Sequence, residues 1–180
     1  MIKTDPTLSY RVLNIAANTF NDASTSYYHQ SIGGYHGAKL KRYKELIDYR
    51  ISPEMTALRT AMQKPDSSTQ KVFASQTTLN MLNAKYIIYN PDAQPIVNQG
   101  ALGNAWFVSE YKMVANADAE LAALNNFNPK TTAIVDQRFT DKLTGLNLQA
   151  DSSATIKMTG YKPNHLTYES NSNSEQLAVF

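Results

Sequence analysis

Residues 18–40 read NTFNDASTSYYHQSIGGYHGAKL, and the rest of the chain is organised around this stretch. It holds three tyrosines, two histidines, five hydroxyl residues and three glycines between an expected strand and an expected helix. Gly33 and Gly34 admit backbone angles that other residues resist. Polar and aromatic side chains on a loop commonly hold a ligand or fasten two layers together. The sequence therefore predicts that this loop binds a ligand, fastens the fold, or does both.

The composition indicates a globular protein. Its 180 residues, 42% hydrophobic and 18% charged, fit one domain or one domain with part of another. The formal net charge is +2, and the basic cluster at residues 39–44 alternates with apolar residues like a solvated helix face. We therefore expect no nucleic-acid partner. The chain has no cysteine, which excludes disulfides, thiolate catalysis and thiolate zinc sites.

The apolar runs are short. None approaches the roughly 20 residues that a membrane-spanning helix needs, and the first residues lack the apolar core of a signal peptide. If the domain works outside the cytoplasm, we expect a segment beyond this chain to carry it there.

Periodicity predicts the first elements. Residues 10–15 are rich in β-branched and aromatic side chains, which is typical of a strand. Residues 38–50 repeat Leu40, Tyr43 and Ile47 at helical spacing, with charged residues between them. This pattern predicts an amphipathic helix with those three side chains turned inward.

A second helix is expected to begin at Ser52. Ser52 is a candidate N-cap, Pro53 suits the first helical position, and Glu54 places an acid in the first turn. The inward stripe of this helix is expected to be Met55, Leu58 and Met62. Residues 65–69 then predict a polar loop.

The middle of the chain predicts a helix that leads into a buried strand. Residues 75–83 are expected to be helical with Leu79 and Leu82 inward, and residues 84–89 to form the strand. Residues 90–104 form a second loop rich in proline and glycine. Loops of this length without regular structure are often functional.

The firmest structural prediction is a strand, a helix and a strand between residues 106 and 135. An aromatic strand is expected at residues 106–114, and Asn116 can cap a helix over residues 117–127. A strand at residues 131–135 follows. The usual arrangement of such a unit is a right-handed parallel crossover.

The last forty residues have a different texture, with short alternating runs that predict three strands and turns at residues 160–164 and 171–174. We divide the chain into an α+β domain, residues 1–140, and a β segment, residues 141–180, that is expected to belong to a β-sandwich continuing past Phe180. The predicted fold class is α+β: a mixed sheet with flanking helices, one βαβ unit and a C-terminal antiparallel β segment.

The histidines are the first candidates for chemistry. His29 and His36 flank the glycine pair, and with Asp22 they could gather around a metal or act as acid and base. Their spacing matches no strong metal signature. A triad of Ser24, His36 and Asp22 lacks a nucleophile elbow. Hydrogen bonding within a structured loop is the favoured interpretation, and we expect no catalytic residue, metal or cofactor in the chain.

The tyrosines are candidates for binding a sugar. Tyr27, Tyr28 and Tyr35 each offer an apolar face with a polar rim, and Asn21, Asp22 and the two histidines could supply hydrogen bonds. The alternative is that these rings pack against the sheet. We expect most of the loop to be packed, with a partly exposed rim left for a ligand.

Two further patterns are weak. Residues 33–37 superficially suggest a phosphate-binding loop, but they have neither the P-loop ending nor dinucleotide spacing. Trp106 and residues 98–104 make a second possible ligand edge, for which core packing is the simpler explanation.

Several segments resemble one family. YRVLNI and NTFNDASTSYYHQSIGGYHGAKLKRYKEL (residues 10–46) look like the extracytoplasmic region of the bacterial YfhO-like membrane proteins. LNMLNAKYII (79–88), GNAWFV (103–108) and TIKMTGYKPNHLTYESNSNSEQLAVF (155–180) agree with that family in the same order. The resemblance covers most of the chain.

The resemblance implies a multi-span protein similar to GT-C glycosyltransferases, which take sugar from a polyprenyl-phosphate carrier outside the cytoplasm. The chain would be an extracytoplasmic domain of a bacterial cell-membrane protein, with the membrane-embedded remainder of the same polypeptide as its partner and a glycan or lipid-linked sugar as its ligand. The acidic base expected of such enzymes lies outside this chain, so recognition is the expected role. The alternatives are a structural or protein-interaction domain and, third, a free-standing hydrolase.

Overall fold

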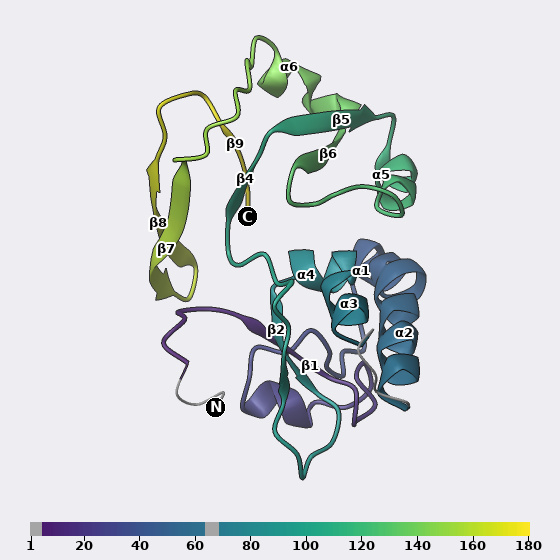
Figure 1. Cartoon of the computed structure of the whole chain (residues 1–180). Coiled ribbons are helices and arrows are strands. Elements are labelled where there is room, and N and C mark those ends of the chain that lie inside the picture. The colour runs from purple at the N-terminus through teal and green to yellow at the C-terminus, as the bar shows by residue number, and fades with distance from the viewer. Residues whose placement is uncertain (1–4, 64–68) are drawn as a thin grey trace. The chain divides into compact units, whose positions relative to one another are not determined.

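The computed structural model describes residues 5–63 and 69–180 (Figure 1). Contacts between residues divide the chain into two compact units, Met1–Leu102 and Gly103–Phe180. The predicted α+β class and its mixed sheet are confirmed. Within the described residues, no helix is both long and apolar enough to cross a membrane.

The first unit is built on a small mixed sheet in the order β1-β2-β3. Strand β1 (Arg11–Asn14) runs parallel to β2 (Ala84–Ile88), and β3 (Ile96–Val97) pairs antiparallel with β2. The first two strands confirm the expectations from their β-branched and aromatic composition. Leu13 and Ile87 are fully buried, so the sheet contributes the centre of the core.

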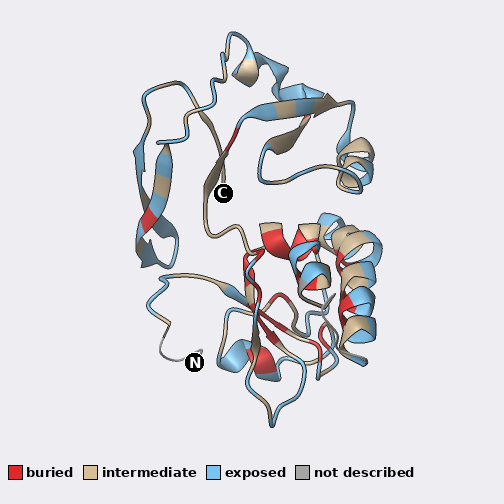
Figure 2. Cartoon of the chain, viewed as in Figure 1, coloured by how far each residue is buried: buried red, intermediate tan, exposed pale blue. Residues whose placement is uncertain are grey.

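Helices supply the other half of that core. They are α1 (Lys41–Leu46), the π-helical turn η3 (Ile47–Ile51), α2 (Ser52–Gln63), α3 (Thr69–Ala74) and α4 (Thr77–Met81). Figure 2 shows the buried residues of this unit on β1, β2 and the neighbouring helices. The core cluster consists of Leu13, Ile15, Ile32, Ile47, Ile51, Met55, Leu58, Phe73, Leu79, Ala84 and Ile87.

The expected N-cap at Ser52 is wrong, although the α-helical segment α2 does begin there. Ser52 has helical angles, φ −64° and ψ −43°, and its N–H donates to Ile47 O, so the helix runs on from Lys41 to Gln63. Pro53 has no N–H and its ring clashes with the carbonyl of the preceding turn. A π turn widens the helix at that point, which lets the chain pass the proline without stopping.

The inward stripes were predicted in part. Ile47, Met55 and Leu58 are buried as expected, whereas Leu40 is 80% exposed because it precedes the first turn of α1. Of the predicted polar loop, residues 65–68 lie outside the described residues, and Thr69 begins α3 instead.

Glu54 lies in the first turn of α2, as expected, and its side chain also contacts a second helix. Its two carboxylate oxygens accept the backbone N–H groups of Thr78 and Leu79 at 2.7 and 2.9 Å. Those N–H groups belong to the first turn of α4, where no intrahelical partner exists. The contact joins α2 to the short helix that leads into β2.

The second unit contains the predicted βαβ. Strand β5 (Glu110–Val114), helix α5 (Ala117–Ala123) and strand β6 (Thr132–Asp136) follow one another, and the two strands pair in parallel. Asn116 caps α5, as expected, by accepting Ala119 N–H at 3.0 Å. The helix is shorter than the expected residues 117–127.

The expected strand at residues 106–114 is two strands. Strand β4 (Trp106–Val108) pairs antiparallel with β9 (Leu177–Val179), while β5 pairs with β6, so the chain changes partner at Ser109. Both Ser109 N–H and Ser109 Oγ–H donate to Thr131 O.

The antiparallel C-terminal pair is confirmed. Strand β7 (Thr155–Lys162) and β8 (His165–Asn171) form a hairpin in which Asn164 has φ 65°. Gly160 lies inside β7 at a register shift rather than in the turn. Two short helical turns, η4 (Gln137–Phe139) and α6 (Thr140–Leu143), precede it. We predicted a division of the chain at residue 140, but this position lies inside the second unit. Strand β9, after that position, pairs with β4, before it.

Candidate functional site

The loop at residues 18–40 returns to the edge of the first sheet. Val12 N–H donates to Gln30 O at 2.8 Å, and Ile32 N–H donates to Val12 O at 3.0 Å. Ser31 thereby forms a parallel bridge with Val12. The Ile32 side chain, 3% exposed, enters the core. The loop is therefore anchored at its middle by backbone hydrogen bonds.

Asn14, at the end of β1, organises the first half of the loop. Its Oδ1 accepts Ala16 N–H and Ala17 N–H at 3.0 and 3.2 Å. Its Nδ2 donates to Thr25 Oγ1 at 2.9 Å, and its carbonyl accepts Thr19 Oγ–H at 2.7 Å. Asparagine and threonine side chains readily form hydrogen bonds with nearby backbone groups. Here these bonds stabilise the turn that follows β1.

Gly33 lies where two backbone segments touch. A Cβ atom on Gly33 would stand 1.9 Å from Thr19 O and 2.8 Å from Thr19 C, so no larger residue fits. Gly34 has φ +134° and its N–H donates to Thr19 O at 2.8 Å. The predicted unusual backbone angle is found at Gly34, whereas Gly33 is required by its close contact with Thr19.

This close approach also excludes the phosphate-loop interpretation. Gly33 N–H donates to Ser31 Oγ at 3.0 Å and Gly34 N–H to Thr19 O. The amides of the glycine pair are therefore used to close the loop.

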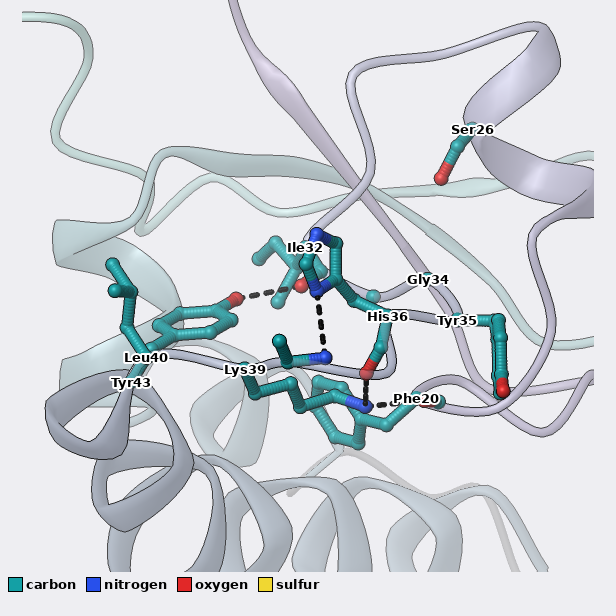
Figure 3. A pocket seen from close by; sticks show the side chains of 11 residues that line it. Phe20, Ser26, Ile32, Gly34, Tyr35, His36, Lys39, Leu40 and Tyr43 are labelled. Carbon is teal, nitrogen blue, oxygen red and sulfur yellow. Dashed lines mark hydrogen bonds between the residues drawn. The ribbon is translucent and has the colours of Figure 1, made fainter.

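The loop and the start of α1 enclose a pocket of about 430 Å³ (Figure 3). Tyr43 spans it from α1, and its hydroxyl donates to Ile32 O at 2.6 Å. Burial raises the pKa of the Tyr43 phenol, and the positive charge of Arg11 partly opposes that rise. The lining residues are Phe20, Ser26, Ile32, Gly33, Gly34, Tyr35, His36, Ala38, Lys39, Leu40 and Tyr43.

His36 and Lys39 hold the second half of the loop. His36 Nδ1 accepts Ala38 N–H at 3.1 Å. Lys39 Nζ donates to Phe20 O at 3.1 Å and to His36 O at 3.3 Å, so it ties both sides of the loop together (Figure 3). These contacts fix the polar edge of the pocket.

Two of the predicted site residues, Tyr35 and His36, line this pocket, whereas Asn21, Asp22, Tyr27, Tyr28 and His29 do not. Asp22 instead accepts Ser24 N–H at 2.8 Å and also Ser24 Oγ–H. These two hydrogen bonds hold the pKa of the Asp22 carboxyl below its usual range. Asp22 therefore closes a local turn.

The alternative, that the three tyrosines pack against the sheet, is wrong. Tyr27, Tyr28 and Tyr35 are 85%, 82% and 68% exposed. The first of them ends the short 3₁₀ helix η2 (Ser24–Tyr27), whose buried residue is Thr25. The small polar residues and the backbone fasten the loop, and the aromatic rings stay in solvent.

The chemistry considered for the histidines is not assembled. Nowhere in residues 5–63 and 69–180 do three His, Asp or Glu side chains gather as metal ligands. Ser24 bonds directly to Asp22 rather than through a histidine, and His36 Nδ1 is engaged with Ala38 N–H. The triad of Ser24, His36 and Asp22 is therefore not formed.

The second loop, residues 90–102 of the first unit, is fastened by buried amides. Asn98, 3% exposed, donates from Nδ2 to Asn80 Oδ1 at 2.8 Å and to Ala84 O at 3.0 Å, and its Oδ1 accepts Gly100 N–H at 3.0 Å. Asn80 N–H donates in turn to Gln76 O. Asn98 thus packs in the core, which is the simpler of the two predicted explanations.

Sequence reasoning missed most of the lining. Phe20, Lys39 and Tyr43 reach the pocket from three different places, and only folding of the loop onto α1 brings them together. A usable signal was the glycine pair itself, because a close backbone contact at Gly33 forces the flanking segments to converge.

Comparison with known proteins adds no relative. The sequence matches no protein-family model, and no curated protein or solved structure matches it.

Proposed function

We propose that the chain is a sugar-recognising accessory domain, not catalytic alone, of a membrane glycosyltransferase that takes sugar from a polyprenyl-phosphate carrier. In this proposal it lies on the extracytoplasmic side of a bacterial cell membrane, and the membrane-embedded remainder of the same polypeptide is its partner. The resemblance of residues 10–46 to the YfhO-like proteins supports the membrane context. The observation that carries the recognition role is the pocket between the loop and α1.

The lining of the pocket suits a sugar ring. Phe20, Ile32 and Tyr43 supply apolar surface, and Tyr35 stands at the pocket with 68% of its surface exposed. Tyrosine offers a face for the C–H groups of a sugar and a hydroxyl for its oxygens. A volume of about 430 Å³ falls in the range of small-molecule sites. One or two sugar rings are the ligands that fit this combination.

We expect the domain alone to be catalytically inactive because its candidate groups are engaged in other contacts. Asp22 is held by Ser24, and His36 Nδ1 accepts a backbone N–H, so neither is placed as the base of an acid–base pair. We expect no turnover of activated glycosides or polyprenyl-phosphate sugars by the purified chain.

A second candidate function is protein interaction. Tyr27 and Tyr28 are more than four-fifths exposed and lie outside the pocket lining. Exposed tyrosines are enriched where proteins meet. In this alternative the domain fastens the membrane part or a partner protein, and the pocket has no ligand.

A glycan array separates the two functions. The purified chain is probed beside Tyr35→Ala, Tyr28→Ala and the control Tyr49→Ala, which removes a tyrosine that is 63% exposed on η3. Sugar recognition at the pocket predicts binding that Tyr35→Ala abolishes while the other two variants retain it. Absence of glycan binding by the wild-type chain contradicts the proposal, and loss in Tyr28→Ala but not in Tyr35→Ala moves the site out of the pocket.

A further inference from the structure

The charge of the pocket restricts what it can bind. Among the described residues that line it, Lys39 alone carries a formal charge, and the lining includes no aspartate or glutamate. Within the described part of the chain, no ion pair joins Lys39 to a carboxylate. Lys39 as a residue is partly buried, so part of its side chain is removed from solvent.

The Lys39 ammonium is held in place and retains a donor. An ammonium has three N–H groups, and two of them are directed to Phe20 O and His36 O. These contacts already order the lysine side chain, so binding a ligand costs less conformational entropy. The third N–H remains for a group that enters the pocket.

His36 adds a second donor. Because Nδ1 accepts Ala38 N–H, the neutral ring carries its proton on Nε2. The ring lines the pocket (Figure 3), so the nitrogen without a partner among these contacts is a donor rather than an acceptor. Lys39 and His36 together favour a ligand with a strongly accepting group.

We propose that the sugar bound in this pocket is acidic, a hexuronate or a sugar phosphate, with its anionic oxygens at Lys39 Nζ and its ring against Tyr35 and Tyr43. This inference rests on the proposed function, since it names the class of sugar that the same pocket takes. A neutral sugar leaves the Lys39 ammonium without a counter-charge in the pocket. An anion supplies one and accepts charge-assisted hydrogen bonds, which are stronger than neutral ones.

Calorimetry on the whole chain compares four probes: methyl glucoside, glucuronate, glucose 1-phosphate and inorganic phosphate. The proposal predicts that one or both acidic sugars bind at least about tenfold more tightly than methyl glucoside. It predicts that inorganic phosphate, which has no ring, binds more weakly than the acidic sugars. The stronger of the two acidic sugars identifies the source of the anion.

Two lysine variants locate the charge. Lys39→Gln is expected to lower the affinity for the acidic sugar by about tenfold and to leave methyl glucoside little changed. Lys41→Gln is the matched control, because Lys41 lies two residues further on with its side chain 88% exposed and outside the lining. It removes the same charge and is expected to leave binding unchanged.

The outcomes separate this inference from the proposed function. Equal affinity for neutral and acidic sugars overturns the acidic class and leaves sugar recognition standing. Failure of all three sugars overturns both. Equal loss in Lys41→Gln, or phosphate binding as tightly as glucose 1-phosphate, overturns the assigned contacts. If Lys39→Gln does not fold, the comparison of probes on the wild-type chain still decides.

Discussion

Two loops of the first unit, residues 18–40 and residues 90–102, are fastened to the same sheet in different ways. The second uses a side chain, Asn98, which is buried and makes all its hydrogen bonds within the core. The first combines backbone contacts at Gly33, Gly34 and Ile32 with side-chain hydrogen bonds from Asn14 and Lys39, and it leaves three tyrosine rings exposed.

The difference shows how similar loop compositions lead to different roles. Asparagine side chains satisfy backbone groups that folding removes from water, so a loop fastened through them has its polar groups engaged. In the first loop the three tyrosine rings stay exposed, so they remain available to a ligand. We therefore place recognition in the first loop and scaffolding in the second.

The largest effect is expected for Gly33→Ala. The added methyl would lie 1.9 Å from the backbone oxygen of Thr19, which also accepts Gly34 N–H, so the two segments would have to move apart. Overpacking of this kind costs about 3 kcal/mol or more in the free energy of unfolding. Gly37→Ala is the control, since nothing lies within 4 Å of the new Cβ. Equal urea midpoints for the two variants would mean that the close contact between Gly33 and Thr19 does not restrict residue 33.

Asn98→Ala tests the second loop. It leaves Asn80 Oδ1, Ala84 O and Gly100 N–H without their partner in the core. We expect a loss of about 2 kcal/mol, measured by urea unfolding. Gln99→Ala, at an exposed neighbouring position, is expected to change stability by less than about 0.5 kcal/mol. If Asn98→Ala is as stable as Gln99→Ala, the amide network does not fasten the loop.

An ion pair between Asp5 and Lys85 of β2 stabilises the same sheet in a third way, and this contact depends on pH. Asp5 Oδ2 lies 2.6 Å from Lys85 Nζ and accepts Tyr86 O–H at 2.8 Å. Burial alone would raise the pKa of the Asp5 carboxyl, but hydrogen bonds from Lys85, Thr7 and Tyr86 outweigh burial and hold that pKa far below its usual range.

A depressed carboxyl pKa stabilises the fold above the unfolded value of about 4, and the stabilisation is lost as the pH falls below it. Between pH 5 and pH 3 the stability advantage of the wild type over Asp5→Asn should shrink by on the order of 1 kcal/mol. Urea unfolding at the two pH values measures it. A constant difference would mean that folding does not lower the pKa of the Asp5 carboxyl.

The smallest effect on stability is expected for the exposed tyrosines. Tyr28→Ala and Tyr35→Ala remove rings that are 82% and 68% exposed, and surface substitutions of this kind change stability by about 0.5 kcal/mol or less. Thermal melts of both variants beside the wild type test this. A large drop in either melting temperature would show that the ring fastens the loop after all.

The βαβ unit was predictable because its signals are local. Asn116 caps α5 with its own side chain, and the strands on either side follow at short spacing. The buried stripe of Met55 and Leu58 was equally readable from helical periodicity.

Where local signals conflict with the surrounding structure, the sequence misleads. Ser52 and Pro53 have the composition of a helix start, yet a π turn carries the helix through them. Ser109 carries no breaker signal, and the change of partner there depends on β9, nearly seventy residues further on. Such outcomes depend on tertiary contacts that no short window contains.

The site follows the same division. The glycine pair and the pocket residues Tyr35 and His36 were found from composition, since glycines beside polar aromatics are unusual in a mere connector. Lys39 reads as part of a solvated helix face, and its role depends on the carbonyls of Phe20 and His36 that the folded loop brings to it.

The central claim is that the first loop binds sugar and the second is scaffold. Nitrogen-15 chemical shifts, recorded while the purified chain is titrated with the tightest sugar from the array, test it most directly. If the first loop binds sugar, the largest changes in chemical shift occur at Phe20 and residues 32–43, and the shifts of residues 90–102 stay unchanged. Shifts centred on residues 90–102, or none at saturating sugar, would contradict it.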